Sequence, residues 1–430
     1  MRFLCYLRNM KRYTYIGIFT LLLGITHTSH AQSDRVYDSM IHTLQTIVND
    51  DWLHDDVIVL GTDDRVNISF DHFTHDYNRF TYKIIHCNAD WDPSDLFEVD
   101  YMDGFNGLPI EDYENSLNTT MLYTHYHLEL PNDDVQFKAS GNYRVEIYLN
   151  EDEDKNEAKK VADACFRIVE PRMGLNVSVT SNTDIDTNLS HQQVSFTLNY
   201  PPNEVIDPTT EIKPYVYQNG RTDNCVSSLK PTYATPGRLE YTHNPKLIFP
   251  AGNEYRRFEI INMHYATQGV DKVSYFDPYY HATLLPDTYR RNYSFDVDHN
   301  GRYLIRYNLA EDTNIEADYL FVHFALDIPQ RKGGNFYLSG AFTYNTFSPE
   351  FQATYNNAEQ RYETIVLLKQ GAYDFMYLWV PDGSNIGQAA PAEGNYYETE
   401  NEYQVYIYHR PFGGRYDRLV AVQQFKFSQE

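Results

Sequence analysis

The sequence predicts an all-β chain made of tandem β-sandwich domains, about three of them. Apolar and polar residues alternate with period two in every third of the chain, which is the mark of half-buried antiparallel strands. The chain also has 39 Tyr and 24 Phe against 3 Trp, and Tyr and Phe are enriched in strands. Turn-forming pairs such as Asn219-Gly220 and Asn300-Gly301 separate the alternating runs.

The first 31 residues predict a secretory signal peptide. Basic residues precede an apolar run at 16–25, and Ser29 and Ala31 supply the small residues of a cleavage site. This run is too short for a membrane-spanning helix, which needs ~20 apolar residues. We therefore expect cleavage after Ala31 and a mature, exported chain that begins at Gln32.

The mature chain divides into three predicted domains. The first sandwich covers residues 32–171, the second covers 172–309 and the third covers 310–430. Units of this length, with many short strands and frequent turns, are typical of immunoglobulin-like sandwiches. Segment 37–48 fits either a helix or a strand, because its apolar spacing suits a helix and its Val, Ile and Thr content suits a strand.

The charge balance argues against two classes of partner. The chain has 35 Lys plus Arg and 60 Asp plus Glu, for a formal charge of -25. Residues 1–31 hold four basic residues and no acid, so the mature chain carries -29. A field of this sign repels phosphate backbones and anionic lipid headgroups. We expect no nucleic-acid binding and no direct membrane insertion.

Cysteine and metal patterns predict neither a disulfide framework nor a structural metal. The mature chain keeps Cys87, Cys165 and Cys225, with no CxxC, and whether any two of them pair stays open. The segment 296–301 opens like a calcium loop. Its twelfth position is Tyr307 rather than the bidentate Glu that such loops need, so a β-turn is favoured.

No sequence motif predicts catalysis. The chain lacks GxSxG, HExxH, GxxxxGK[ST] and GxGxxG. His86 and Cys87 are neighbours, but adjacent residues of a strand point to opposite faces and cannot easily touch. Carboxylate pairs are frequent in so acidic a chain and identify no cleft. We expect no catalytic residue, no metal ligand and no cofactor.

The best candidates for contact with a partner are Asn88, Asp90 and Trp91. They follow the end of the predicted strand that contains His86 and Cys87. A Trp at such a tip can anchor an interface by burying a large apolar area. The alternative is that Trp91 packs inside its own domain, and the sequence leaves both readings open.

A series of segments occurs in the same order as in a known family. The segments are IIHCNADW (84–91), DYMDGF (100–105), IEDYENSLNT (110–119), YTHY (123–126), SGNY (140–143), YQNGR (217–221), FPAGNEYR (249–256), LLKQGAY (367–373), EGNYYETENEY (393–403) and GRYDRL (414–419). Together they resemble the plug protein family of the type IX secretion system of Bacteroidota. Each segment is weak alone, but their order through nearly the whole mature chain is distinctive.

This resemblance implies a structural role in the periplasm. Proteins of this family sit at the periplasmic face of the outer membrane, bind the translocon β-barrel and close its periplasmic opening when no cargo is in transit. A barrel wide enough for folded cargo would leak unless one end were occupied. The resemblance therefore implies a monomer within a hetero-complex, without cofactor.

Two other functions stay open. The third domain resembles early-set immunoglobulin-like modules of glycogen-handling enzymes, in which Phe347 would stand where these modules often carry an aromatic residue. An exported carbohydrate-binding or carbohydrate-active protein is therefore the alternative. An outer-membrane barrel would also fit the alternating strands, but the frequent turns and the acidic runs suit sandwiches better.

Overall fold

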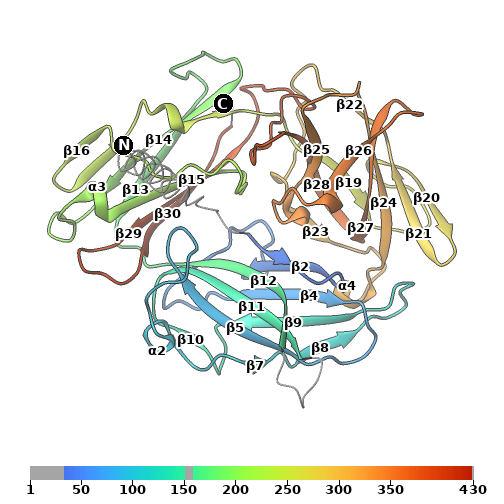
Figure 1. Ribbon diagram of the computed structural model, residues 1–430, viewed down its shortest axis with the longest axis horizontal. Coiled ribbons are helices and arrows are strands. Elements are labelled where there is room, and N and C mark those ends of the chain that lie inside the picture. Colours follow the sequence, from blue (N-terminus) through green and yellow to red (C-terminus); the bar gives the residue numbers. More distant parts are fainter. Residues whose placement is uncertain (1–32, 151–157, 429–430) are drawn as a thin grey trace, which may run out of the picture. The chain divides into compact units, whose positions relative to one another are not determined.

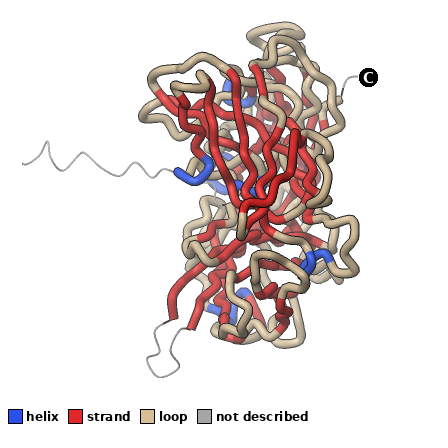
Figure 2. The backbone as a smooth tube through the Cα atoms, turned by 90° about the vertical axis from the view of Figure 1, so that its right-hand side faces the viewer, coloured by secondary structure: helices blue, strands red, loops and turns tan. Residues whose placement is uncertain are grey.

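The computed structural model describes residues 33–150 and 158–428, which all belong to one compact unit. The predicted signal peptide lies outside this range. The prediction of an all-β chain is confirmed, because strands dominate every part and the helices are single turns (Figure 2). Within the described residues, no helix combines the length and the apolar character needed to cross a membrane. Three hydrophobic cores define the N-terminal, middle and third lobes.

The N-terminal lobe runs from β1 to β12 and packs two sheets face to face (Figure 1). Phe70 of one sheet meets Phe80 of the other with ring centroids 5.1 Å apart. Segment 37–48, for which the sequence allowed either a helix or a strand, contains strand β2, which pairs antiparallel with β4. The strands are β1 (Arg35–Val36), β2 (Ile41–Val48), β3 (Val57–Val59), β4 (Val66–His72), β5 (Phe80–Cys87), β6 (Met102–Asp103), β7 (Leu108–Pro109), β8 (Asp112–Asn115), β9 (Thr124–Leu130), β10 (Gln136–Phe137), β11 (Gly141–Asn150) and β12 (Ala158–Val169), with helix α2 (Glu98–Tyr101).

The middle lobe combines strands from two distant parts of the chain. Strand β15 pairs with β29, and β29 pairs with β30 near the C-terminus. Phe249 and Tyr403 meet in the shared core, with ring centroids 5.4 Å apart. The elements are β13 (Gly174–Thr180), β14 (His191–Asn199), α3 (Pro208–Glu211), β15 (Ile212–Gln218), β16 (Tyr233–Thr235), β17 (Arg238–Tyr241), η1 (Pro245–Leu247), β18 (Ile248–Pro250), β29 (Glu402–His409) and β30 (Arg418–Lys426).

The third lobe is built on one ten-stranded sheet that curls around its own core. Phe258 near one end of the sheet contacts Phe324 near the other end, with ring centroids 5.5 Å apart. The elements are β19 (Arg256–Ile260), β20 (Val270–Phe276), β21 (Tyr279–Leu284), β22 (Asp287–Thr288), β23 (Tyr303–Ile305), α4 (Thr313–Glu316), β24 (Tyr319–Asp327), β25 (Gly334–Ser339), η2 (Ala341–Thr343), η3 (Pro349–Phe351), β26 (Gln352–Asn356), β27 (Arg361–Lys369) and β28 (Gly371–Pro381).

The sheets do not follow the predicted division at residue 309. Strands β19 to β23 were expected in the second domain, yet they belong to the sheet of the third lobe. Strands β19 and β23 pair with β28, strands β21 and β22 pair with β24, and β20 pairs with β21. Strands β29 and β30 were expected in the third domain, yet they complete the middle lobe. The alternation pattern is local, so it identifies strands without showing which of them pair. The first predicted boundary, after β12, coincides with the end of the N-terminal lobe.

Candidate functional site at the junction of the lobes

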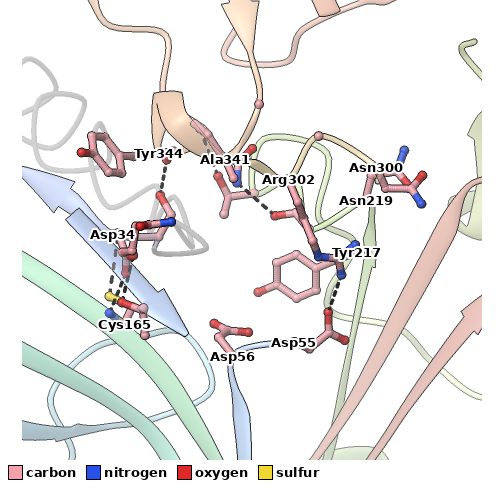
Figure 3. Close-up of a pocket in the computed structure, with 18 of the residues that line it drawn as sticks. Asp34, Asp55, Asp56, Cys165, Tyr217, Asn219, Asn300, Arg302, Ala341 and Tyr344 are labelled. Carbon is pink, nitrogen blue, oxygen red and sulfur yellow. Dashed lines mark hydrogen bonds and ion pairs between the residues drawn. The ribbon is translucent and has the colours of Figure 1, made fainter. Parts of the chain in front are cut away.

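The three lobes meet around a cavity of about 230 Å³, here called the junction cavity. Its lining includes Asp34, Asp56, Cys165, Tyr217, Arg302 and Tyr344 (Figure 3). These residues come from all three lobes, so the cavity exists only while the lobes are in contact. Buried ion pairs at and around it hold the lobes together.

Arg302 joins all three lobes at the cavity wall. It lies just before β23 and donates to Asp55 of the N-terminal lobe at 3.1 Å (Figure 3). It also donates to Glu402 of the middle lobe at 2.8 Å. The preceding Gly301 has φ +85°, and a Cβ there would lie 2.6 Å from the ring of Tyr255. Only glycine fits this turn, and the turn places Arg302.

Arg167 links the N-terminal and middle lobes. This β12 side chain is 6% exposed, and Nη1 donates to both carboxylate oxygens of Asp56 at 2.8 and 2.7 Å. Its guanidinium lies over the rings of Trp91, Tyr217 and Tyr406, at 5.1, 5.4 and 4.4 Å from their centroids. Such stacking is worth about 2 kcal/mol or more when the cation is desolvated.

The predicted contact residues lie beside this arginine. Trp91 is 3% exposed and packs with Cys87 and Cys165, which favours the reading in which it belongs to the interior. Asn88 is half-buried, and its Oδ1 accepts from Arg410 at 2.5 Å and from the backbone N–H of Asp417 at 3.2 Å. Asp90 is also half-buried. Asn88 therefore contacts the β29–β30 hairpin of the same chain, and contact of the three residues with a partner stays a prediction.

Lys369 links the N-terminal and third lobes. Its Nζ lies 2.6 Å from Asp71 Oδ2, and both side chains are 1% exposed. Asp71 also accepts from Tyr319 at 2.6 Å and contacts His125 at 2.7 Å. Burial alone would raise the pKa of Asp71, but Lys369 and His125 outweigh it and hold that pKa below its usual range. Burial lowers the pKa of Lys369.

The environments of the cysteines and of His86 do not suit nucleophilic chemistry. Burial raises the pKa of Cys87 and of Cys225 to about 12, and that of Cys165 well above its usual value. A thiol is a nucleophile only as thiolate, and these pKa values keep all three protonated. Burial also lowers the pKa of His86 to about 4. The three cysteines are free thiols.

The rejected calcium loop has a structural role. Asp298 accepts from the backbone N–H of Asn300 at 3.1 Å and from that of Tyr255, so its carboxylate caps the turn before Arg302. Across residues 33–150 and 158–428, no group of three or more His, Cys, Asp or Glu side chains is placed to hold a metal ion.

Three buried carboxyl groups of the third lobe predict a pH-dependent stability. Burial, reinforced by Asp374, raises the pKa of Asp298 to about 7. Burial, reinforced by Asp298, raises that of Glu254 to about 7, and burial raises that of Asp374 to about 6. The unfolded chain titrates these groups near pH ~4, so between pH ~4 and ~7 the folded protein binds more protons.

The free energy of unfolding should therefore fall as the pH rises from about 4 to about 7. Urea unfolding midpoints at about pH 5 and about pH 8 measure this, and Asp298→Asn should reduce the difference because one of the coupled groups no longer titrates. A midpoint that rises between the two pH values would contradict the assignment.

Sequence reasoning missed Arg167, Arg302 and Lys369. A usable signal exists for two of them, because Arg167 stands between the apolar residues Phe166 and Ile168 and Lys369 directly follows the apolar run 365–368. A charge in such a position must find a buried partner. No comparable signal marks Arg302, whose neighbours are those of an ordinary turn.

Comparison with known proteins shows the family to which the chain belongs. The family described as "Type 9 secretion system plug protein 1st domain" matches residues 41–170. The chain belongs to the type IX secretion system plug family. A crystal structure of a hypothetical protein from Parabacteroides merdae is 43% identical, with a TM-score of 0.89 over 92% of this chain and 100% of that one. No curated protein matches the chain.

The family match covers most of the N-terminal lobe. It includes Asp55, Asp56, Asp71 and Arg167, which are the N-terminal-lobe members of the buried ion pairs. Asp55 and Asp71 join this plug domain to the third lobe through ion pairs, and Arg167 joins it to the middle lobe through its stacking on Tyr217 and Tyr406. The likeness to the P. merdae protein extends over the other lobes as well.

Proposed function

We propose that this chain is a plug subunit that binds the outer-membrane translocon barrel of the type IX secretion system and seals its periplasmic opening when no cargo is in transit. The observation that carries this proposal is the plug-domain match over residues 41–170. The predicted signal peptide supports a position in the periplasm, at the inner face of the outer membrane. The role is structural and needs no catalytic residue.

The buried ion pairs between lobes support this role physically. A subunit that closes a pore must resist deformation, and lobes joined only by surface contacts would move relative to each other. Arg302, Arg167 and Lys369 each place a desolvated charge at a lobe boundary. Separating the lobes would break the pairs of Arg302 with Asp55 and Glu402 and the pair of Lys369 with Asp71, which costs several kcal/mol for each broken pair. It would also remove the rings of Tyr217 and Tyr406 from Arg167, whose ion pair with Asp56 lies within the N-terminal lobe. The plug would therefore enter and leave the barrel as one body.

Deleting the gene should make the outer membrane more permeable to large antibiotics, provided that the translocon is present. The physical reason is that an unoccupied barrel is an open pore. Antibiotic sensitivity of the deletion strain measures this, and a strain lacking both plug and translocon is the control. Unchanged permeability in the single deletion would contradict sealing.

Carbohydrate binding remains a second candidate because of one surface feature. Tyr275, Phe276 and Tyr279 are 52%, 64% and 39% exposed at the turn between β20 and β21. None of them lines the junction cavity. Phe347 is half-buried and packs against Tyr337, with ring centroids 5.4 Å apart. A glycan-array screen separates this candidate from the plug role.

A further inference from the structure

The most exposed large apolar side chains of the described residues lie in three segments, which are the loops around Ile206 and Phe412 and the segment 97–105. Phe97, Val99, Phe105, Ile206 and Phe412 are 73%, 71%, 78%, 82% and 92% exposed, and no other large apolar side chain of the described residues exceeds 70%. We call these five residues the apolar ridge. Single exposed apolar residues are common, whereas a group of them marks an interaction surface.

Polar contacts join the three loops into one surface. Arg415 of the β29–β30 hairpin lies 2.8 Å from Asp100, in the loop that carries Phe97 and Phe105. The hairpin residue Arg410 donates its backbone N–H to Glu211 at 2.9 Å. Glu211 in turn accepts from the backbone N–H of Ile206 at 3.3 Å. The hairpin that carries Phe412 therefore contacts both other loops, and Figure 1 shows the strands β29 and β30 of this hairpin on the left.

The backbone beneath the ridge is held in place. Tyr101 and Met102 are 5% and 1% exposed, and the hydroxyl of Tyr101 donates to the backbone carbonyl of Ile84 at 2.9 Å. Lys138 Nζ donates to the carbonyl of Val99 at 2.8 Å. Gly104 has φ +137°, and a Cβ there would collide with the backbone of Asp134. A surface that is already ordered loses little conformational entropy on binding.

The loop that carries Phe97, Val99 and Phe105 is acidic, whereas Arg410 and Arg415 beside Phe412 are paired with Asp417 and Asp100. Residues 90–105 contain six acids and no Lys or Arg. Asp92, Asp95 and Glu98 are exposed and make no ion pair with any described residue. An anionic lipid surface would repel this loop. A protein surface that offers apolar pockets edged by Lys or Arg would complement it.

We propose that the apolar ridge is the surface by which this chain contacts the translocon, and that it meets apolar pockets with a basic rim on the periplasmic side of the barrel. This inference rests on the proposed plug function. Phe97, Phe105 and Phe412 are the anchors, because buried aromatic side chains carry most of the energy of an interface. The exposed acids Asp92, Asp95 and Glu98 increase the rate of association with the basic rim of the barrel and make that rate depend on salt concentration.

The test is retention of the translocon by the tagged, full-length chain from detergent-solubilised outer membranes. The variant Phe97→Ser/Phe105→Ser/Phe412→Ser should weaken binding ~100-fold, because each lost anchor costs more than 1 kcal/mol. The matched control is Phe276→Ser/Phe295→Ser/Leu309→Ser, whose side chains are 64%, 67% and 67% exposed in the third lobe. It should bind like the wild type, and circular dichroism should show both variants folded.

Two further measurements make the result decisive. The variant Asp92→Asn/Asp95→Asn/Glu98→Gln should slow association and flatten its salt dependence. Phosphatidylglycerol vesicles should not bind the wild-type chain, and vesicle binding that depends on the three phenylalanines would overturn the proposal in favour of a lipid surface. If the wild type retains the translocon and the ridge variant does so equally, the ridge assignment alone is wrong. If the wild type retains no translocon, the plug function itself fails.

Discussion

Replacing Lys369 by methionine should lower the free energy of unfolding by about 3–5 kcal/mol, because it leaves the carboxylate of Asp71 buried without its cation. Both side chains are 1% exposed, so water cannot take the place of the ammonium group. The loss should fall on the boundary between the N-terminal and third lobes, since Asp71 belongs to the first and Lys369 to the second. Urea-induced unfolding measures the change.

A surface pair provides the matched control. Lys426 lies 3.4 Å from Glu400, and their side chains are 50% and 33% exposed. Lys426→Met should cost less than about 1 kcal/mol, because exposed pairs contribute little. In the double variant Lys369→Met/Asp71→Asn, part of the loss should be regained. Equal, small effects of the two lysine substitutions would show that the Lys369 pair does not hold the lobes.

Trp91→Ala should also destabilise the protein strongly, by about 3–5 kcal/mol, because truncating a buried Trp removes its packing and leaves a cavity. Trp91 is 3% exposed and supports the guanidinium of Arg167 at 5.1 Å. Its φ of 66° is rare for a bulky residue, so the surrounding packing imposes this conformation. Thermal unfolding of the variant checks the prediction.

Trp52→Ala is the comparison for this second substitution. Trp52 is half-buried against His299, so the same chemical change should cost clearly less there. A Trp91 variant that kept its full stability but lost affinity for the translocon would show that Trp91 is an exposed anchor, the other reading that the sequence allows.

Local patterns in the sequence were sufficient to identify the strands. The alternation of Val194, Phe196 and Leu198 corresponds to β14, and that of Tyr143, Val145 and Ile147 corresponds to β11. Each of these side chains is buried, while their neighbours in β14 are more exposed. Period two follows from the geometry of a single strand, so it needs no knowledge of the partner strand.

Strand pairing and the buried charges could not be predicted in this way. The pairing of Val216 in β15 with Val405 in β29 joins residues far apart in the chain, and no local pattern records it. The ion pair between Arg302 and Asp55 depends on the same long-range packing. The resemblance found through ordered segments such as IIHCNADW identified the family, because that inference uses the whole chain rather than one strand.

The different exposure of Trp91 and Phe97 could not be predicted from local sequence patterns either. Trp91 and Phe97 both stand in an acidic loop after β5, and nothing in their spacing distinguishes them. In the structure Trp91 is 3% exposed and Phe97 is 73% exposed. The difference arises because Trp91 packs against Arg167, Cys87 and Cys165, whereas the side chain of Phe97 projects into solvent.

A conductance measurement tests the proposed closure of the translocon by this chain. Purified translocon barrels, inserted in a planar lipid bilayer, should conduct ions until the full-length chain is added to the periplasmic side. We expect the conductance to fall, and to fall much less with the variant Phe97→Ser/Phe105→Ser/Phe412→Ser at the same concentration. Conductance that stays unchanged when saturating wild-type chain is present would contradict the account.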